Sequence, residues 1–96
     1  VPGVAAAGLD SYPNPFNPRT VLRFNTSAPG RVQLVIHDIR GHRVRQLISE
    51  DLPAGPHEFL WDGLNAQGRA VASGQYFARL AVPNSPPVTR KLMLVR

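Results

Sequence analysis

The stretch of sequence that decides the fold is Trp61-Asp62-Gly63-Leu64-Asn65-Ala66-Gln67-Gly68-Arg69-Ala70-Val71-Ala72-Ser73-Gly74-Gln75-Tyr76-Phe77. Two aromatic, apolar runs, Phe59-Leu60-Trp61 and Tyr76-Phe77, flank a segment rich in Asp, Asn and Gly, which predicts two strands joined by an ordered loop. Asp62-Gly63 ends the first strand, and Asn65-Ala66-Gln67-Gly68 has the residue types of a tight turn that tolerates positive φ. We expect Val71, beyond these turns, to hold the loop against the domain.

The composition of the chain fits a single domain built from short strands. Its 96 residues are 43% hydrophobic, enough for one core that buries somewhat over roughly 60% of the surface of the unfolded chain. Ten prolines and eight glycines are spread along the sequence and argue against long helices. Without cysteine the domain has no disulfide and no thiolate metal site, so the core alone must stabilise it.

Several segments alternate apolar and polar residues with the period of a half-buried strand. Leu22 and Phe24 fall on one face of residues 20–26, and Val32, Leu34 and Ile36 fall on one face of residues 31–37. Further strands are expected at residues 9–12, 43–48, 57–61, 75–82 and 88–95. Turns or loops are expected at residues 27–30, 38–41, 51–56 and 83–87, where Gly, Pro, Asn, Asp and Ser gather.

Proline and irregular spacing mark three places that depart from this pattern. Pro13-Asn14-Pro15-Phe16-Asn17-Pro18 holds three prolines, which fix φ and remove donors, so we expect a rigid turn with Phe16 tucked inward. Val44 and Leu47 are three residues apart, and we interpret this spacing as a strand with a bulge rather than a helical turn. Pro56 has no N–H donor, so we expect that the strand following it lies at a sheet edge or that Pro56 is the first residue of this strand.

About seven short strands separated by turns predict an antiparallel β-sandwich of the immunoglobulin-like class. The chain lacks the inter-sheet disulfide of that class, so large apolar side chains must fill the centre, with Trp61 beside Phe24, Phe59 and Tyr76. The expected core consists of Phe16, Leu22, Phe24, Leu34, Ile36, Phe59, Trp61, Tyr76 and Leu80.

The formal net charge of +5 and the isoelectric point near 11.1 invite a nucleic-acid or anionic-surface interpretation. The arginines are scattered, however, and many alternate with apolar residues, as solvent-facing positions of strands do. The sequence has no basic helix and no aromatic platform, so we expect no nucleic-acid site. An anionic surface polysaccharide stays open as a partner. No apolar run approaches transmembrane length, and membrane insertion is not expected.

The chain holds few residues suited to catalysis. His37, His42 and His57 are the only candidates for acid–base work near neutral pH, and none has a partner carboxylate at a recognisable spacing. His37 and Asp38 are adjacent, which in a strand places their side chains on opposite faces. The sequence has no Gly-Xaa-Ser-Xaa-Gly elbow and no phosphate-binding glycine loop. We therefore expect a non-catalytic domain without a cofactor.

The loop after Trp61 raises the alternative of a calcium site built from Asp62, Asn65 and Gln67. Its spacing does not match an EF-hand, and the closing bidentate Glu is missing. Asp62 and Asn65 are better explained as residues that cap their own turns, so no metal site is predicted. Sugar binding through an exposed ring is a further alternative. Phe77 is the candidate, because the neighbouring aromatic residues fall on the core-facing phase.

The short motifs of the chain, taken together, resemble a known family. They are Tyr12-Pro13-Asn14-Pro15-Phe16-Asn17-Pro18, Asp38-Ile39-Arg40-Gly41, Trp61-Asp62-Gly63, Ala72-Ser73-Gly74-Gln75-Tyr76-Phe77 and Lys91-Leu92-Met93-Leu94-Val95-Arg96. The combination resembles the type A C-terminal sorting domains of type IX (Por) secretion, and equally the immunoglobulin-like domain of the flagellar hook-capping protein. The resemblance covers about residues 10–96 and leaves residues 1–9 as the remnant of a linker.

The resemblance implies a module that directs a secreted parent protein, often a hydrolase, from the periplasm through the type IX translocon to the surface of a Gram-negative bacterium. Its partner would be the outer-membrane secretion machinery, and we expect a monomeric domain. The family's Gly-Xaa-Tyr element falls on Gly74 and Tyr76. Its terminal basic and apolar element falls on Lys91, Leu92, Met93, Leu94, Val95 and Arg96, a last strand whose edge we expect a partner to bind.

Two other functions stay open. One is a structural immunoglobulin-like spacer or assembly domain, including a role like that of the hook cap. The other is a carbohydrate-binding accessory module of a secreted hydrolase.

Overall fold

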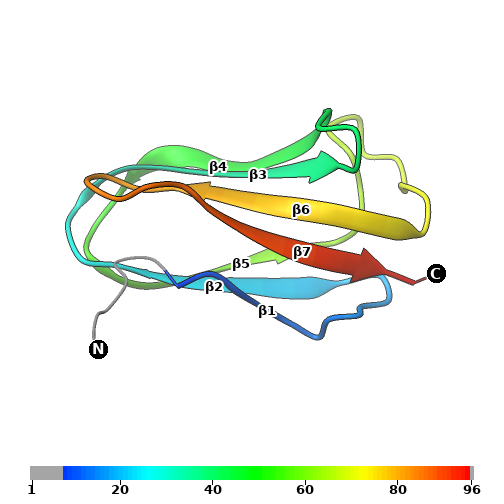
Figure 1. The fold of residues 1–96 in the computed structure, drawn as a ribbon, viewed down its shortest axis with the longest axis horizontal. Coiled ribbons are helices and arrows are strands. Elements are labelled where there is room, and N and C mark those ends of the chain that lie inside the picture. Colours follow the sequence, from blue (N-terminus) through cyan, green and yellow to red (C-terminus); the bar gives the residue numbers. More distant parts are fainter. Residues whose placement is uncertain (1–7, 96) are drawn as a thin grey trace.

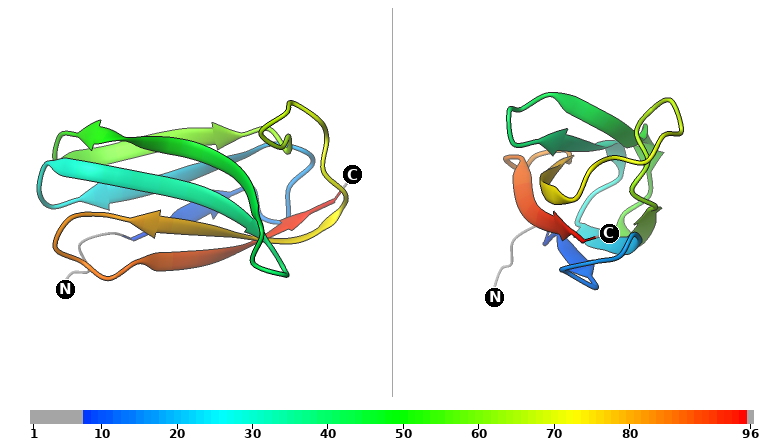
Figure 2. Two further views of the ribbon diagram at one scale, coloured as in Figure 1. Left: turned by 90° about the horizontal axis from the view of Figure 1, so that it is seen from above. Right: turned by 90° about the vertical axis from the view of Figure 1, so that its right-hand side faces the viewer.

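The computed structural model describes residues 8–95, which form two facing antiparallel β-sheets (Figure 1; Figure 2). The strands are β1 (Asp10–Tyr12), β2 (Thr20–Thr26), β3 (Gly30–Asp38), β4 (Arg43–Leu52), β5 (Gly55–Trp61), β6 (Gly74–Ala81) and β7 (Val88–Leu94). One sheet has the order β1-β2-β5 and the other the order β4-β3-β6-β7. The predicted immunoglobulin-like sandwich of about seven strands is confirmed.

The alternating segments become strands with one buried and one solvent-facing side. Leu22 and Phe24 of β2 and Val32, Leu34 and Ile36 of β3 point between the sheets and are at most 3% exposed. The remaining expected core residues are also buried, except Phe59, which is half-buried on the edge strand β5 and packs against the core. The core also includes Leu9, Ile48, Ala78, Val82, Leu92 and Leu94.

The aromatic side chains form two groups rather than the single centre that the sequence suggested. Trp61 is fully buried and packs against the rings of Phe16, at 5.5 Å between centroids, and Tyr76, at 5.4 Å. Phe24 instead packs against Phe59, at 5.9 Å. The two groups separate because residues 24 and 61 lie near opposite ends of the paired strands β2 and β5, where Thr20 faces Trp61 and Phe24 faces His57.

Strand β4 contains the predicted β-bulge, and it also contains a second one. Leu34 pairs with Ile48 and Val35 with Gln46, so Leu47 is an extra residue, and the pairing shifts again between Ile36 and His37, where Val44 is extra. The apolar pair spaced three apart therefore marks two bulges. Beyond them β4 continues to Leu52, so the loop expected at residues 51–56 shrinks to a short turn before β5.

The turn between β3 and β4 is organised by the Asp38 carboxylate. Its Oδ1 accepts hydrogen bonds from the backbone N–H groups of Arg40 and His42, each at 2.9 Å, and Gly41 adopts φ 85°. Partial burial raises the pKa of Asp38 and is the largest single influence. The two backbone donors and the charges of His42 and Arg40 together outweigh it and lower the pKa from its ordinary value of 3.8.

Candidate functional site

The residues that the family resemblance singles out lie side by side at one end of the sandwich (Figure 1). β6 and β7 pair in antiparallel register, so Gly74 faces Leu94, Tyr76 faces Leu92 and the neighbouring Phe77 faces Lys91. The structure thus brings the Gly-Xaa-Tyr element together with the terminal strand. Arg96, the last residue of the expected element, lies outside the described residues, as does most of the expected linker at residues 1–9.

Gly74 opens β6 in a conformation that side chains disfavour. Its φ is 151°, in a region that L-residues rarely adopt, whereas a Cβ placed on it would meet nothing within 4 Å. The requirement for glycine here is therefore one of backbone conformation and not of space.

Tyr76 fastens the loop of residues 62–73 to the core. Its ring is buried edge-on against Trp61, and its hydroxyl donates a hydrogen bond of 2.6 Å to the carbonyl oxygen of Ala72. This combination of a buried ring and a bonded hydroxyl is how tyrosine anchors a chain segment. Tyr76 therefore shapes the region from inside and offers little surface to a partner.

Strand β7 divides the terminal element into an inner and an outer set. Leu92 and Leu94 are fully buried, and Lys91 lies on the outer face of the four-stranded sheet together with Met93, which is half-buried. Val95 follows the strand and is 47% exposed. The surface that a partner can read on this element consequently comes from Lys91, Met93 and Val95.

The outer edge of β7 is covered along its C-terminal half, contrary to the open edge that we expected. Phe16 donates its N–H to Met93 O at 2.9 Å and accepts the N–H of Val95 at 2.8 Å. The Asn14 side chain accepts from Met93 N at 3.0 Å and donates to Lys91 O at 2.9 Å. The proline-rich turn thereby forms hydrogen bonds with the backbone N–H and C=O groups of this part of β7, as a neighbouring strand would. This protects the edge from non-specific strand pairing.

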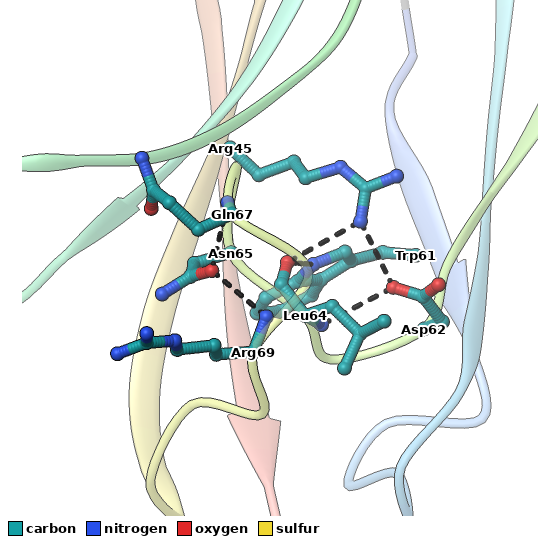
Figure 3. A network of polar contacts seen from close by, with 7 residues as sticks. All are labelled: Arg45, Trp61, Asp62, Leu64, Asn65, Gln67 and Arg69. Carbon is teal, nitrogen blue, oxygen red and sulfur yellow. Dashed lines mark hydrogen bonds and ion pairs between the residues drawn. The ribbon is translucent and has the colours of Figure 1, made fainter.

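Two of the three side chains considered for calcium, those of Asp62 and Asn65, accept hydrogen bonds from the protein through their Oδ1 atoms (Figure 3). Asp62 Oδ1 accepts from Leu64 N and from an Arg45 guanidinium nitrogen, both at 3.1 Å. Asn65 Oδ1 accepts from the backbone N–H groups of Gln67, at 2.9 Å, and Arg69, at 3.0 Å. These are the turn-capping bonds that the sequence predicted. Within residues 8–95, no group of three or more acidic, His or Cys side chains is placed to hold a metal ion.

The Leu64 carbonyl joins this loop to the core. It accepts a hydrogen bond of 3.0 Å from the Trp61 indole N–H, and a guanidinium nitrogen of Arg45 lies 3.4 Å away (Figure 3). The Ala66 N–H of the loop donates a hydrogen bond of 3.1 Å to the carbonyl oxygen of Val44, the extra residue of the second bulge of β4. Val71 packs against the core, as expected.

The three histidines stabilise turns. His37 Nδ1 lies 3.2 Å from Gly41 O, and His57 Nε2 lies 2.8 Å from Pro53 O. His42 Nδ1 lies 3.7 Å from a carboxylate oxygen of Asp38, which itself caps the β3–β4 turn. Each histidine thus has a local partner, and the arrangement offers no nucleophile beside a base.

The expectation that Phe77 is the exposed ring is wrong. Phe77 is half-buried on the outer face of the four-stranded sheet, between His37 on β3 and Lys91 on β7. The exposed aromatic side chain is Tyr12, which is 70% exposed on β1. Strand alternation correctly assigned Phe77 to the outward face, but β6 lies between β3 and β7, and an outward ring on an inner strand is only partly open to solvent.

The two-sheet arrangement, the Greek-key-like crossing of strands between sheets and the packed tryptophan define an immunoglobulin-like β-sandwich. The sequence matches the FlgD Ig-like domain over residues 18–85, and the chain belongs to this family, a class of non-catalytic module. The sequence matches no curated protein. Within residues 8–95, no helix is long and apolar enough to cross a membrane.

Three solved structures share the fold. Latent PorU from Porphyromonas gingivalis matches with a TM-score of 0.74 and 22% identity over 99% of this chain and 10% of PorU. PorZ, a surface component of the type-IX secretion system of the same organism, gives 0.58 and 22% over 93% of this chain and 12% of PorZ. FlgD from Xanthomonas campestris, a protein of flagellar hook capping, gives 0.62 and 25% over 93% of this chain and 62% of FlgD. This chain therefore corresponds to about a tenth of PorU or PorZ, and those two likenesses show the fold alone.

Proposed function

We propose that the domain is a sorting module that directs a secreted parent protein through the type IX translocon to the surface of a Gram-negative bacterium. The observation that carries this proposal is the union of two motifs from opposite ends of the chain. Asn14 and Phe16 bond the backbone of residues 91–95 across sequence separations of up to 79 residues. The motifs of the family resemblance thus form one folded unit rather than a linear tag.

The recognised surface would consist of the outward side chains of the terminal element beside the proline-rich turn. Lys91 supplies a positive charge, and Met93 and Val95 supply apolar area, a combination suited to protein recognition. PorZ, a surface component of the type-IX secretion system, has the same fold, and this supports the proposed link to that system without bearing on which side chains are recognised.

The burial pattern decides which variant tests the proposal. Deleting residues 91–96 would remove Leu92 and Leu94 from the core, so loss of export would follow from unfolding as readily as from loss of an address. Substituting Lys91, Met93 and Val95 by alanine changes the readable surface and leaves the two buried leucines in place.

The experiment fuses a periplasmic reporter to the chain in a host with type IX secretion and measures the reporter at the cell surface. We expect the fusion to reach the surface and the reporter alone to remain in the periplasm. The triple alanine variant should fold and accumulate in the periplasm. Equal surface delivery of the reporter with and without the domain would refute the proposal.

That refuting result would favour a structural spacer or assembly domain instead. The membership in the FlgD Ig-like family and the likeness to a hook-capping protein support this second candidate. A spacer predicts that replacing the domain with an unrelated sandwich of similar length preserves the parent protein's activity and location.

A further inference from the structure

The fold gathers several cationic side chains on one face of the molecule, although the arginines are scattered along the sequence. On the outer face of the four-stranded sheet, strand register brings together four cationic side chains, here called the cationic face: Arg31, Arg43, Arg79 and Lys91. Asp51, opposite Arg31 at one end, is the only acidic residue at the outward positions of these strands. On the outer face of the β1-β2-β5 sheet, by contrast, the cation Arg23 lies between two acidic residues, Asp10 on β1 and Glu58 on β5.

A row of side chains crosses the whole cationic face. Arg43 on β4 faces His37 on β3, His37 faces Phe77 on β6, and Phe77 faces Lys91 on β7. At about 4.8 Å between strands, the row extends about 14 Å. It runs across the strands, and a ligand chain lying along it would meet a cation at each end, Arg43 and Lys91.

A depression lies beside this row. It has a volume of about 130 Å³ and is lined by Gln33, Val35, His37, Arg43, Arg79 and Ala81. Val35 forms an apolar floor, only 8% exposed although it points outward. Two guanidinium groups with an amide and an imidazole at its rim suit an oxyanion flanked by hydroxyl groups, because guanidinium groups bind oxyanions bidentately, and amide and imidazole groups form hydrogen bonds with hydroxyls.

The cations of the depression are available to a ligand. Arg43 and Arg79 are exposed, and neither forms an ion pair with another residue between 8 and 95. Arg45 and Arg90, by contrast, are paired with Asp62 and Asp10, at 3.1 and 3.5 Å. Arg43 and Arg79 therefore keep their guanidinium groups free of ion pairs within residues 8–95.

We propose that the cationic face binds an anionic polysaccharide, with a sulfate, phosphate or carboxylate group of the glycan in the depression between Arg43 and Arg79. A nucleic acid fits less well, because the two rings on this face, Phe77 and His37, are both half-buried and offer no open stacking platform. An acidic peptide strand would pair with a sheet edge, whereas this site lies on the face of the sheet.

The test measures binding of a heparin-derived sulfated oligosaccharide of defined length to the 96-residue chain by titration calorimetry. We expect affinity that falls as salt is raised, and a loss of about tenfold or more in the double variant Arg43→Gln/Arg79→Gln. The matched control, Arg19→Gln/Arg23→Gln, removes the same charge before and on β2 and should lose much less. Melting temperatures of both variants near the parent's establish that they fold.

Two results would overturn the proposal. Equal losses in the two double variants would show that net charge alone attracts the ligand. Equal or tighter binding of single-stranded DNA or polyglutamate of matched charge would assign the face to another class of partner. Because neither arginine lies on β7, this test is independent of the sorting proposal, and either can fail without the other.

Discussion

Replacing Trp61 with alanine should be the most damaging single substitution in the domain. Its side chain is fully buried, touches the rings of Phe16 and Tyr76, and bonds the Leu64 carbonyl through its indole N–H. Truncating a buried tryptophan costs about 3–5 kcal/mol. A domain of this length has a total stability of roughly 5–14 kcal/mol, so the change removes a large part of it.

A second variant separates the stability that comes from the ring contacts of Trp61 from the stability that comes from its indole hydrogen bond. Trp61→Phe keeps a ring against Phe16 and Tyr76 but removes the indole donor and part of the buried area. We expect it to cost about 1–2 kcal/mol, because the Leu64 carbonyl keeps the nearby Arg45 guanidinium while the ring contacts are partly retained.

Urea unfolding followed by circular dichroism measures these differences, with thermal melts as a second probe. At about 4–8 °C per kcal/mol for a domain of this size, Trp61→Ala should lower the melting temperature by at least about 12 °C. The matched control is Leu60→Ala, the adjacent residue, which is 53% exposed and should change stability by about 0.5 kcal/mol or less. A Trp61→Ala variant as stable as Leu60→Ala would refute the packing argument.

Three further substitutions test local features. Asn14→Ala removes the two side-chain bonds to Met93 N and Lys91 O and should lower the unfolding free energy by about 1–3 kcal/mol; an unchanged urea midpoint would show that the turn is not held to β7 in solution. Gly74→Ala should cost about 1–3 kcal/mol because of its φ of 151°, whereas Gly8→Ala should be neutral; equal effects would contradict the conformational argument. Asp38 has a lowered pKa in the folded state, so its ionised form stabilises the domain above its ordinary pKa of 3.8 and this contribution is lost as the pH falls through the lowered value. The melting-temperature difference between the parent and Asp38→Asn should therefore shrink over that range, and a difference independent of pH would exclude this role.

The local patterns of the sequence predicted the elements of the fold because each pattern has a local physical cause. Alternation predicted β2 with its observed bounds, and the spacing of Val44 and Leu47 predicted the irregularity of β4. The Asn65 turn and the Asp38 turn were predicted from residues whose side chains bond their own backbone within a few positions.

Features that depend on which strands become neighbours could not be predicted in the same way. Asn14 contacts Lys91 and Met93 across nearly the full length of the chain, and no pattern in the neighbouring residues of either segment predicts this contact. The grouping of Arg43 and Arg79 on one face requires the order β4-β3-β6, and the two bulges of β4 bring Arg43 opposite His37. Phe77 is half-buried although it points outward, and this depends on β6 lying between β3 and β7 and not at a sheet edge.

The central claim is that the folded C-terminal element acts as an address read through its outward side chains. The most direct measurement is the fraction of a fused reporter at the cell surface for two matched triple variants. One replaces Lys91, Met93 and Val95 with alanine, and the other replaces Arg23, Tyr12 and Leu60, a cation and two apolar residues on the opposite outer face. With both variants folded, we predict that only the first leaves the reporter in the periplasm. Normal surface delivery by the first variant would contradict the claim.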